Sequence, residues 1–171
     1  MPLVDRRGKI LLTDKGQIAM APNGHGGAVE LLRRKEVREF LQSRSIKYIF
    51  YFQADNPLVQ VADPVFLGFH IEKQAEVSAK AVRRVSPNER LGIFVKKGKN
   101  LTVAQFTEIP VSVRARRDPQ TGELVFGWGN AAVHIFSFSF IEGWDQENRK
   151  LGYHCVEVRA ACIDRKGRKI Q

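Results

Sequence analysis

The chain has 171 residues, which suits one domain or a piece of a larger one, and 43% of them are apolar. This apolar content excludes an intrinsically disordered chain. The apolar runs are too short or too interrupted to cross a bilayer, and no signal-peptide pattern opens the sequence, so we expect no membrane partner. Only Cys155 and Cys162 are present, without the spacing of a metal or redox pair, and a reduced, cytoplasmic protein is expected.

The formal net charge of +10 comes largely from local clusters of Lys and Arg, at residues 33–35, 83–84, 96–97, 114–117 and 165–169. A basic surface attracts nucleic acid, and it equally suits small phosphorylated ligands. No RNP-like aromatic motif, zinc finger or heptad accompanies the clusters. The sequence therefore favours solvated faces on a nucleotide-handling domain, and no nucleic-acid partner is expected.

The first part of the chain predicts a hairpin over residues 9–19, a helix over 28–43 and a strand over 46–53. The hairpin turns at Asp14-Lys15-Gly16, and the helix carries an apolar stripe with charges opposite. The strand is β-branched and aromatic throughout, which predicts burial on both faces, as in a parallel sheet.

A second helix is predicted from Asp63 to about Gln74, because Asp can cap it and Pro64 suits the first helical position. A strand over residues 77–85 and a hairpin formed by 91–96 and 100–106 follow. Residues 108–116 fit either helix or loop, and residues 118–122 predict a turn. The last predicted elements are a strand over 127–136, a short helix over 137–145 and a strand over 153–158. The alternation of strands and helices predicts an α/β sheet with added antiparallel hairpins.

A glycine-rich turn precedes the first predicted helix and contains Pro22, Gly24, His25, Gly26 and Gly27. Glycine allows backbone to approach a ligand closely, and the first amides of a helix lack intrahelical partners. The turn is thus suited to hold a nucleotide, with the His25 imidazole donating to a phosphate or a base. The alternatives are a tight strand-to-helix connection and a histidine that faces solvent.

Asp55 follows the most buried predicted strand, at the sheet edge where ligands bind in open α/β folds. Its carboxylate there could hold Mg²⁺ against phosphate oxygens. The alternative is an Asp that hydrogen-bonds its own backbone in a turn.

Glu108 and Asn130 are polar residues at predicted strand ends with apolar neighbours. Either could bind sugar hydroxyls or an N-acetyl group, although capping of a turn is the interpretation that the residues alone favour. His134 lies between Val133 and Ile135, which favours a core histidine over a catalytic one.

Six ordered segments resemble the eukaryotic-type UDP-N-acetylhexosamine (UDP-N-acetylglucosamine) pyrophosphorylases, within the wider family of UDP-sugar pyrophosphorylases. They are residues 20–27 (MAPNGHGG), 55–64 (DNPLVQVADP) with 66–69 (FLGF), 80–83 (KAVR) with 86–89 (SPNE), 91–94 (LGIF), 106–109 (FTEI) and 129–136 (GNAAVHIF). Ordered matches of this kind across the chain are far more specific than a single glycine-rich loop.

The resemblance implies a Rossmann-related, GT-A-like mixed sheet and a uridylyl transfer from UTP to a sugar 1-phosphate, with release of pyrophosphate and no covalent enzyme intermediate. It places Pro22, Gly24, Gly26 and Gly27 around the uridine, with His25 approaching the nucleotide. Asp55 and His25 are the implied catalytic residues, and Asp55 the implied ligand of the Mg²⁺ cofactor. Asn56, Glu108 and Asn130 are the implied sugar-binding residues.

The departures from the family pattern leave two questions open. The N-terminal glycine-rich triphosphate loop and the C-terminal elements have no counterpart in residues 1–171, so we expect the central portion of a catalytic domain with impaired turnover and a tendency to self-associate. The alternative is a non-catalytic nucleotide-sugar-binding or regulatory fragment that needs a partner chain. The Gly-His-Gly order of residues 24–26 is more like enzymes for UDP-glucose, which leaves the sugar open.

Overall fold

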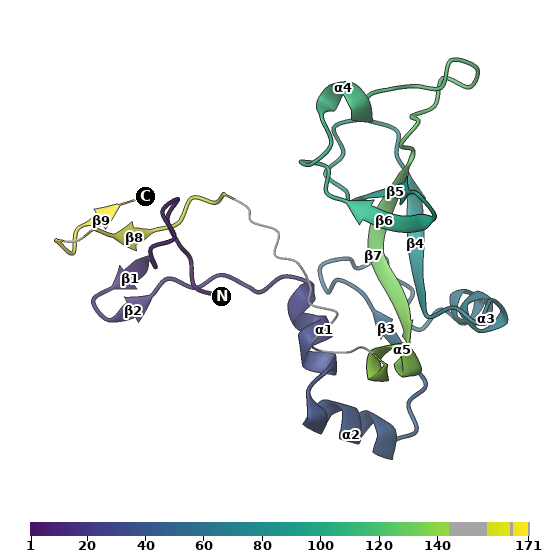
Figure 1. Ribbon diagram of the computed structural model, residues 1–171, viewed down its shortest axis with the longest axis horizontal. Coiled ribbons are helices and arrows are strands. Elements are labelled where there is room, and N and C mark those ends of the chain that lie inside the picture. Colours follow the sequence, from purple (N-terminus) through teal and green to yellow (C-terminus); the bar gives the residue numbers. More distant parts are fainter. Residues whose placement is uncertain (144–156, 165, 171) are drawn as a thin grey trace. The chain divides into compact units, whose positions relative to one another are not determined.

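The computed structural model describes residues 1–143, 157–164 and 166–170 (Figure 1). The chain divides into two compact units, Gln42–Gly143 and a unit that combines Met1–Leu41 with the C-terminal residues. Within the described residues, no helix has the length and apolar character needed to cross a membrane.

The terminal unit contains two small hairpins from opposite ends of the chain (Figure 1). The first hairpin pairs β1 (Leu12–Asp14) with β2 (Gln17–Ile18), and Gly16 takes a φ of +76° in its turn, as the sequence predicted. The second pairs β8 (Cys162–Ile163) with β9 (Lys169–Ile170), and β8 lies against β1. Most of the strand predicted over 153–158 lies outside the described residues, and residues 157 and 158 are not in a strand.

The helix predicted over residues 28–43 is two helices, α1 (Gly26–Leu32) and α2 (Lys35–Ser43). The prediction of one continuous helix was wrong because the hydrogen-bond ladder tightens at the end of α1. There the amide of Arg34 donates to the Leu31 carbonyl, three residues back, at 3.1 Å. The structure also begins α1 at Gly26, so the last two glycines of the turn belong to its first turn.

The second unit is built around β7 (Trp128–Ser137), the longest strand, which runs through the centre of a five-stranded sheet. On one side β7 pairs with β4 (Val77–Arg83). On the other side it pairs first with β5 (Ile93–Lys97) and then with β3 (Tyr48–Tyr51). A hairpin joins β5 to β6 (Asn100–Ala104), as predicted.

All these pairings are antiparallel, so the expectation that β3 lies in a parallel ladder was wrong. β3 and β4 do run in the same direction, because both are antiparallel to β7 and lie on opposite sides of it. They are the two strands of a β–α–β connection with β7 inserted between them. β3 is half-buried along its length, rather than buried on both faces as expected. The mixed α/β class is confirmed.

The connection between β3 and β4 contains α3 (Pro64–Glu72), which begins as predicted. Oδ1 of Asp63 accepts from the amides of Val65 and Phe66, at 3.0 and 3.3 Å. The helix packs on the sheet through edge-on ring contacts of Phe66 with Phe50 and of His70 with Tyr48, with centroids 6.3 and 5.4 Å apart.

Short helices complete this unit. α4 (Val111–Arg114) settles the ambiguity over residues 108–116 in favour of one helical turn, and α5 (Phe138–Glu142) confirms the helix predicted after β7. The predicted turn over residues 118–122 is present, with Oδ1 of Asp118 accepting from the amides of Gln120 and Thr121. The most buried apolar side chains of the unit come from β5, β7, α5 and the segment before β7: Ile93, Leu124, Val133, Ile135, Phe138 and Ile141.

Candidate functional site

A bulge interrupts β7 in the middle of the sheet. Ala79 and Ala81 of β4 pair with His134 and Asn130, so three residues of β7 lie opposite Lys80 alone. Ala132, inside the bulge, has a φ of +54°, a left-handed conformation that costs energy for any residue with a Cβ. Oδ1 of Asn130 accepts from the amide of Ala132 at 2.9 Å and thereby holds the bulge. Asn130 therefore has the capping role that the sequence favoured.

Two loops reach β7 at this bulge. The last β3 residue, Tyr51, pairs with His134 immediately after the bulge, and the loop of residues 52–63 begins there. Immediately before the bulge, the amide of Asn130 donates to the carbonyl of Gly92 at 2.7 Å, where the loop of residues 85–92 ends. Bulges often occur next to binding sites because they redirect side chains. The loop of residues 52–63 contains Asp55 and Asn56, so three of the predicted site residues are in or next to this region.

Asp55 and its neighbour differ in how their side chains are used. Oδ1 of Asn56 accepts from the amide of Leu58 at 3.2 Å, which is the turn role proposed as the alternative for Asp55. Asp55 itself is exposed, and its carboxylate has no hydrogen-bond or ion-pair partner among the residues that the structure describes. No group of three metal-ligating side chains occurs within those residues. One open carboxylate is nevertheless a fitting donor for Mg²⁺, which is usually bound by one or two carboxylates together with phosphate oxygens and water.

The far end of the same loop is anchored to β4. Nζ of Lys80 lies 2.6 Å from Oδ2 of Asp63, and it also lies 5.3 Å from the centre of the Phe66 ring. The hydrogen bond from Lys80, helped by the two helix amides, lowers the pKa of Asp63. Lys80 is the β4 residue opposite the bulge, so one end of the Asp55 loop is tied to the strand that faces the bulge.

The loop of residues 85–92 is held by a buried arginine. Arg84 is 3% exposed, and its Nη1 donates to the Phe126 carbonyl at 2.6 Å. Its Nη2 donates to the carbonyls of Ser86 and Pro87, each at 3.3 Å, whereas its Nε is buried without a partner. The prediction that residues 83–84 lie on a solvated face was wrong for Arg84. Strand alternation is the signal that was missed, since it sends two successive side chains to opposite faces.

Glycine allows the loop to approach β7 closely. A Cβ on Gly129 would lie 2.8 Å from Cδ1 of Leu91, and one on Gly92 would lie 2.7 Å from Cγ1 of Val103. Because contacts this short force one of the atoms to move, a larger residue at Gly129 would displace the Leu91 side chain in the loop, and one at Gly92 would displace the Val103 side chain in β6.

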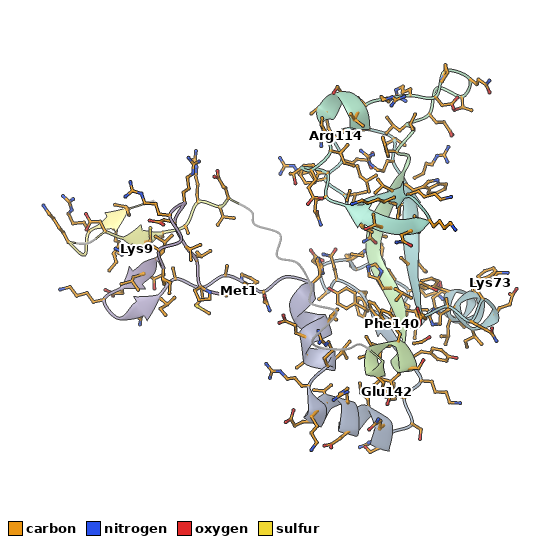
Figure 2. The ribbon with its side chains drawn as sticks, viewed as in Figure 1. Met1, Lys9, Lys73, Arg114, Phe140 and Glu142 are labelled. Atoms are coloured by element: carbon orange, nitrogen blue, oxygen red, sulfur yellow. The ribbon has the colours of Figure 1, made fainter. Side chains whose placement is uncertain are left out.

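Glu108 lies beyond β6 in a reciprocal turn. Its Oε2 accepts from the amide of Gln105 at 2.9 Å, and its own amide donates to the Gln105 carbonyl at 2.9 Å. Next to the turn is Arg114 of α4, which is labelled in Figure 2. It donates to the Phe106 carbonyl and lies 5.6 Å from the centre of the Phe106 ring. The turn-capping interpretation of Glu108 is confirmed, and sugar binding by Glu108 stays a prediction.

The glycine-rich turn lies in the terminal unit. Gly24 has a φ of +63°, and its carbonyl accepts from the amide of Gly27 at 3.3 Å. A Cβ on Gly27 would lie 3.1 Å from the side chain of Asn23. The exposed His25 is the N-terminal cap residue of α1, and Pro22 is also exposed. The glycines thus satisfy the needs of a tight connection, and nucleotide binding by Pro22, Gly24, His25, Gly26 and Gly27 stays a prediction.

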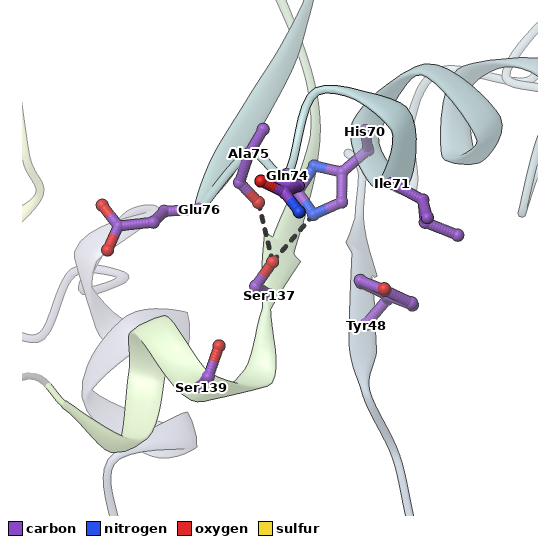
Figure 3. Close-up of a pocket in the computed structure, with 8 residues that line it drawn as sticks. All are labelled: Tyr48, His70, Ile71, Gln74, Ala75, Glu76, Ser137 and Ser139. Atoms are coloured by element: carbon purple, nitrogen blue, oxygen red, sulfur yellow. Dashed lines mark hydrogen bonds between the residues drawn. The ribbon is translucent and has the colours of Figure 1, made fainter.

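A pocket of about 380 Å³ lies at the end of α3 (Figure 3). The side chain of Ser137 donates to the Ala75 carbonyl at 2.8 Å, so its oxygen accepts from Nε2 of His70 at 3.0 Å. Nδ1 of His70 must then accept from the Ser78 hydroxyl at 2.7 Å. The ring is 1% exposed, and burial lowers its pKa. His70 is therefore a neutral, fully hydrogen-bonded core residue, a role that its neighbours in the sequence do not indicate.

His134, which the sequence assigned to the core, is half-buried in β7. Its ring lies 5.9 Å from that of Tyr51 and 6.0 Å from that of Phe136, measured between centroids. His134 therefore lies in an aromatic cluster on one face of the sheet.

Comparison with known proteins adds independent evidence. The family described as UTP–glucose-1-phosphate uridylyltransferase matches residues 1–151. UDP-N-acetylglucosamine diphosphorylase 2 of Arabidopsis thaliana is 38% identical over 96% of this chain, which covers 33% of that protein. The chain spans about a third of the length of the curated relatives that it matches.

Two solved structures are also similar. The structure of a putative UDP-N-acetylglucosamine pyrophosphorylase from Entamoeba histolytica matches with a TM-score of 0.84 and 30% identity, over 99% of this chain and 42% of the other. The uridine diphosphate N-acetylglucosamine pyrophosphorylase from Trypanosoma brucei, solved with an inhibitor, matches with a TM-score of 0.72 and 32% identity. That match covers 83% of this chain and 29% of the other.

Proposed function

Because the chain belongs to the UTP–glucose-1-phosphate uridylyltransferase family, we propose that it forms the nucleotide- and sugar-binding centre of a UDP-sugar pyrophosphorylase. The reaction joins UTP and a sugar 1-phosphate into a UDP-sugar and pyrophosphate. The relatives named for UDP-N-acetylglucosamine make the N-acetylglucosamine 1-phosphate the first substrate to test. The chain covers about a third of those relatives, so the complete transfer reaction is part of this proposal.

The observation that carries this proposal is the open carboxylate of Asp55 in a loop that begins beside the β7 bulge. Asn56 has its side chain in a turn, and Asp63 is tied to Lys80, whereas Asp55 has no partner among the described residues. An exposed acidic side chain without a structural role, in a loop fixed at both ends, is suited to a ligand. The resemblance assigns this residue to the metal, and the structure leaves it available.

In the proposed reaction, a phosphate oxygen of the sugar 1-phosphate attacks the α-phosphorus of UTP in line. The bond from that phosphorus to the bridging oxygen breaks, and pyrophosphate takes the electron pair as it leaves. Such transfers depend on alignment and on neutralising charge, and they need no protein nucleophile. The glycine-rich turn would hold the uridine, with His25 donating to the nucleotide, and Asn56, Glu108 and Asn130 would orient the sugar. Mg²⁺, held by Asp55, would supply charge neutralisation at the phosphates.

Calorimetry on the 171-residue chain tests the proposal. We expect UDP-N-acetylglucosamine and UTP to release binding heat with Mg²⁺ present, and ATP to release far less. Asp55→Asn should weaken binding of UTP about tenfold in Mg²⁺ and leave binding unchanged in EDTA, because only the metal-linked part is lost. Asp14→Asn, in the β1–β2 turn, is a matched control that should bind as the wild type does. Equal and negligible heats for UTP and ATP would contradict the proposal.

A further inference from the structure

Trp128 begins β7 and is half exposed, although it lies in the central strand of the sheet. The residue is 50% exposed, and the guanidinium carbon of Arg83 lies 5.0 Å from the centre of its ring. Arg83 is paired with Trp128 across the β4–β7 ladder and forms an ion pair with Glu123. The ion pair and the cation–π contact together restrict the orientation of the indole. The result is a fixed aromatic side chain with half its surface open to solvent.

Strand alternation places Trp128 on the same face of the sheet as Asn130. Successive side chains of a strand point to opposite faces, so Gly129, between them, faces the other way. The cross-strand partner of Asn130 is Ala81, which is exposed. Its side chain is a single methyl group, so it leaves the surface beside the indole unobstructed. An aromatic ring and an amide are therefore neighbours on one open surface.

The amide of Asn130 has a defined orientation. The Ala132 amide is a donor, so the side-chain atom that it contacts at 2.9 Å must be the oxygen. The Nδ2 group is then directed elsewhere, and it has no partner within residues that the structure describes. Asn130 thus offers two fixed N–H donors beside the Trp128 ring.

We propose that Trp128 is a stacking platform for the hexose ring of the bound sugar nucleotide, with the Asn130 amide donating to an oxygen on that sugar. A hexopyranose has an apolar face of C–H groups and a polar rim, which is the complement of an aromatic surface next to a polar donor. The ring is fixed by Arg83 and Glu123 before the ligand arrives, so little side-chain entropy is lost on binding. This proposal rests on the proposed function, and it adds a specificity residue that no family motif assigned.

Tryptophan fluorescence provides a direct test, because Trp144 is the only other tryptophan in the sequence. In a Trp144→Phe protein, excited at about 295 nm to avoid uridine absorption, UDP-N-acetylglucosamine should change the Trp128 emission, and UMP should leave it unchanged. An equal change with UMP and with the UDP-sugar would overturn the proposal, because the uracil would then be the group on the indole. Binding of the UDP-sugar by calorimetry without a change in emission would also overturn it, and would leave the proposed function standing.

Affinity measurements give a second, independent readout. Trp128→Ala should weaken UDP-N-acetylglucosamine about tenfold and leave UMP binding unchanged, while Trp128→Phe should recover most of the loss. Leu101→Ala, at a residue of β6 that is 72% exposed, is the matched control and should bind both ligands as the wild type does. Equal losses for UMP and the UDP-sugar in Trp128→Ala would contradict a role specific to the sugar. Absence of UDP-sugar binding in the wild type would instead reject the proposed function.

Discussion

Lys80 in β4 and Asp63 before α3 are joined by a 2.6 Å ion pair, although seventeen positions separate them in the sequence. The carboxylate of Asp63 therefore has two roles: Oδ1 caps the helix, and Oδ2 binds Lys80. The pair links the beginning of α3 and the end of the Asp55 loop to the sheet. Its removal should affect the helix and the loop together.

Substitution of Asp63 separates these two roles. Asp63→Ala removes both the cap and the ion pair, and it should lower the Tm by about 5 °C. Asp63→Asn should lower it less, because the amide oxygen can still accept from the helix amides. Thermal unfolding followed by circular dichroism measures both values. Glu72→Gln, which breaks the exposed Glu72–Lys73 pair, is the control and should leave the Tm almost unchanged. A larger loss for Asn than for Ala would contradict the capping role.

The same pair predicts the acid sensitivity of the fold. The pKa of Asp63 is lowered in the folded protein, so the folded state favours the carboxylate more than the unfolded state does. Its contribution to stability is present above the ordinary aspartate pKa of about 3.9, and it is lost as the pH falls through the lower folded pKa. Urea unfolding between pH 5 and pH 3 should show a smaller loss of stability in Asp63→Asn than in the wild type. The difference between the two proteins should be on the order of the effect of one titrating group.

His70 predicts a second pH dependence at milder pH. Burial lowers the pKa of its ring, and the neutral ring satisfies Ser78 and Ser137. Below about pH 6.5 the unfolded chain gains a proton at this histidine that the folded chain resists, so stability should fall as the pH decreases from 7.5 to 5.5. Across this range, the midpoint of urea unfolding should depend less on pH in His70→Gln than in the wild type, even though that variant is less stable at pH 7.5. Identical slopes in the two proteins would exclude His70 as the source.

Arg84 and Arg83 are adjacent arginines with opposite environments, which makes them a matched pair. Arg84→Lys should reduce the free energy of unfolding by about 2 kcal/mol, because a lysine cannot reach three carbonyls from a buried position. Arg83→Lys should cost less than about 0.5 kcal/mol, since that side chain is exposed. Chemical denaturation of the two variants measures the difference. Similar losses at both positions would show that the buried carbonyl contacts contribute little.

The bulge in β7 predicts that glycine substitutions at two neighbouring alanines change the stability in opposite directions. Ala132 has a positive φ, so Ala132→Gly should relieve strain and stabilise the fold by up to about 1 kcal/mol. Ala131→Gly has no such strain to relieve and should destabilise it by about 0.5–1 kcal/mol. Both values come from urea unfolding at constant pH. Destabilisation by Ala132→Gly would mean that the left-handed conformation is absent in solution.

Local chemistry made much of the fold predictable. The Asp63-Pro64 start of α3 and the turns at Gly16 and Asp118 depend on residues within a few positions of one another, and all were confirmed. The partner of β3 was not predictable, because β7 lies more than 75 residues further along the sequence than β3 and an apolar strand fits parallel and antiparallel ladders alike.

The candidate site was predictable to a similar extent. Turn-capping by Glu108 and Asn130 followed from residue type and position, and the structure confirms it. The positions of Arg84 and Trp128 depend on which face of a strand they occupy, and that is fixed only once the strands are paired. Strand alternation predicts only that Arg83 and Arg84 face opposite ways, whereas the burial of Arg84 against the 85–92 loop and the exposure of the Trp128 indole are decided by tertiary structure.

The central place of β7 has a consequence for synthesis on the ribosome. β3, β4 and β5 all emerge before the one strand that joins them, and each must stay unpaired along an edge until residues 128–137 appear. Long-range pairing of this kind slows folding and leaves nascent strand edges open to association with other chains. Ribosome-bound chains that stop short of Trp128 should therefore be protease-sensitive, and those that extend past Ser137 by the length of the exit tunnel should be protected.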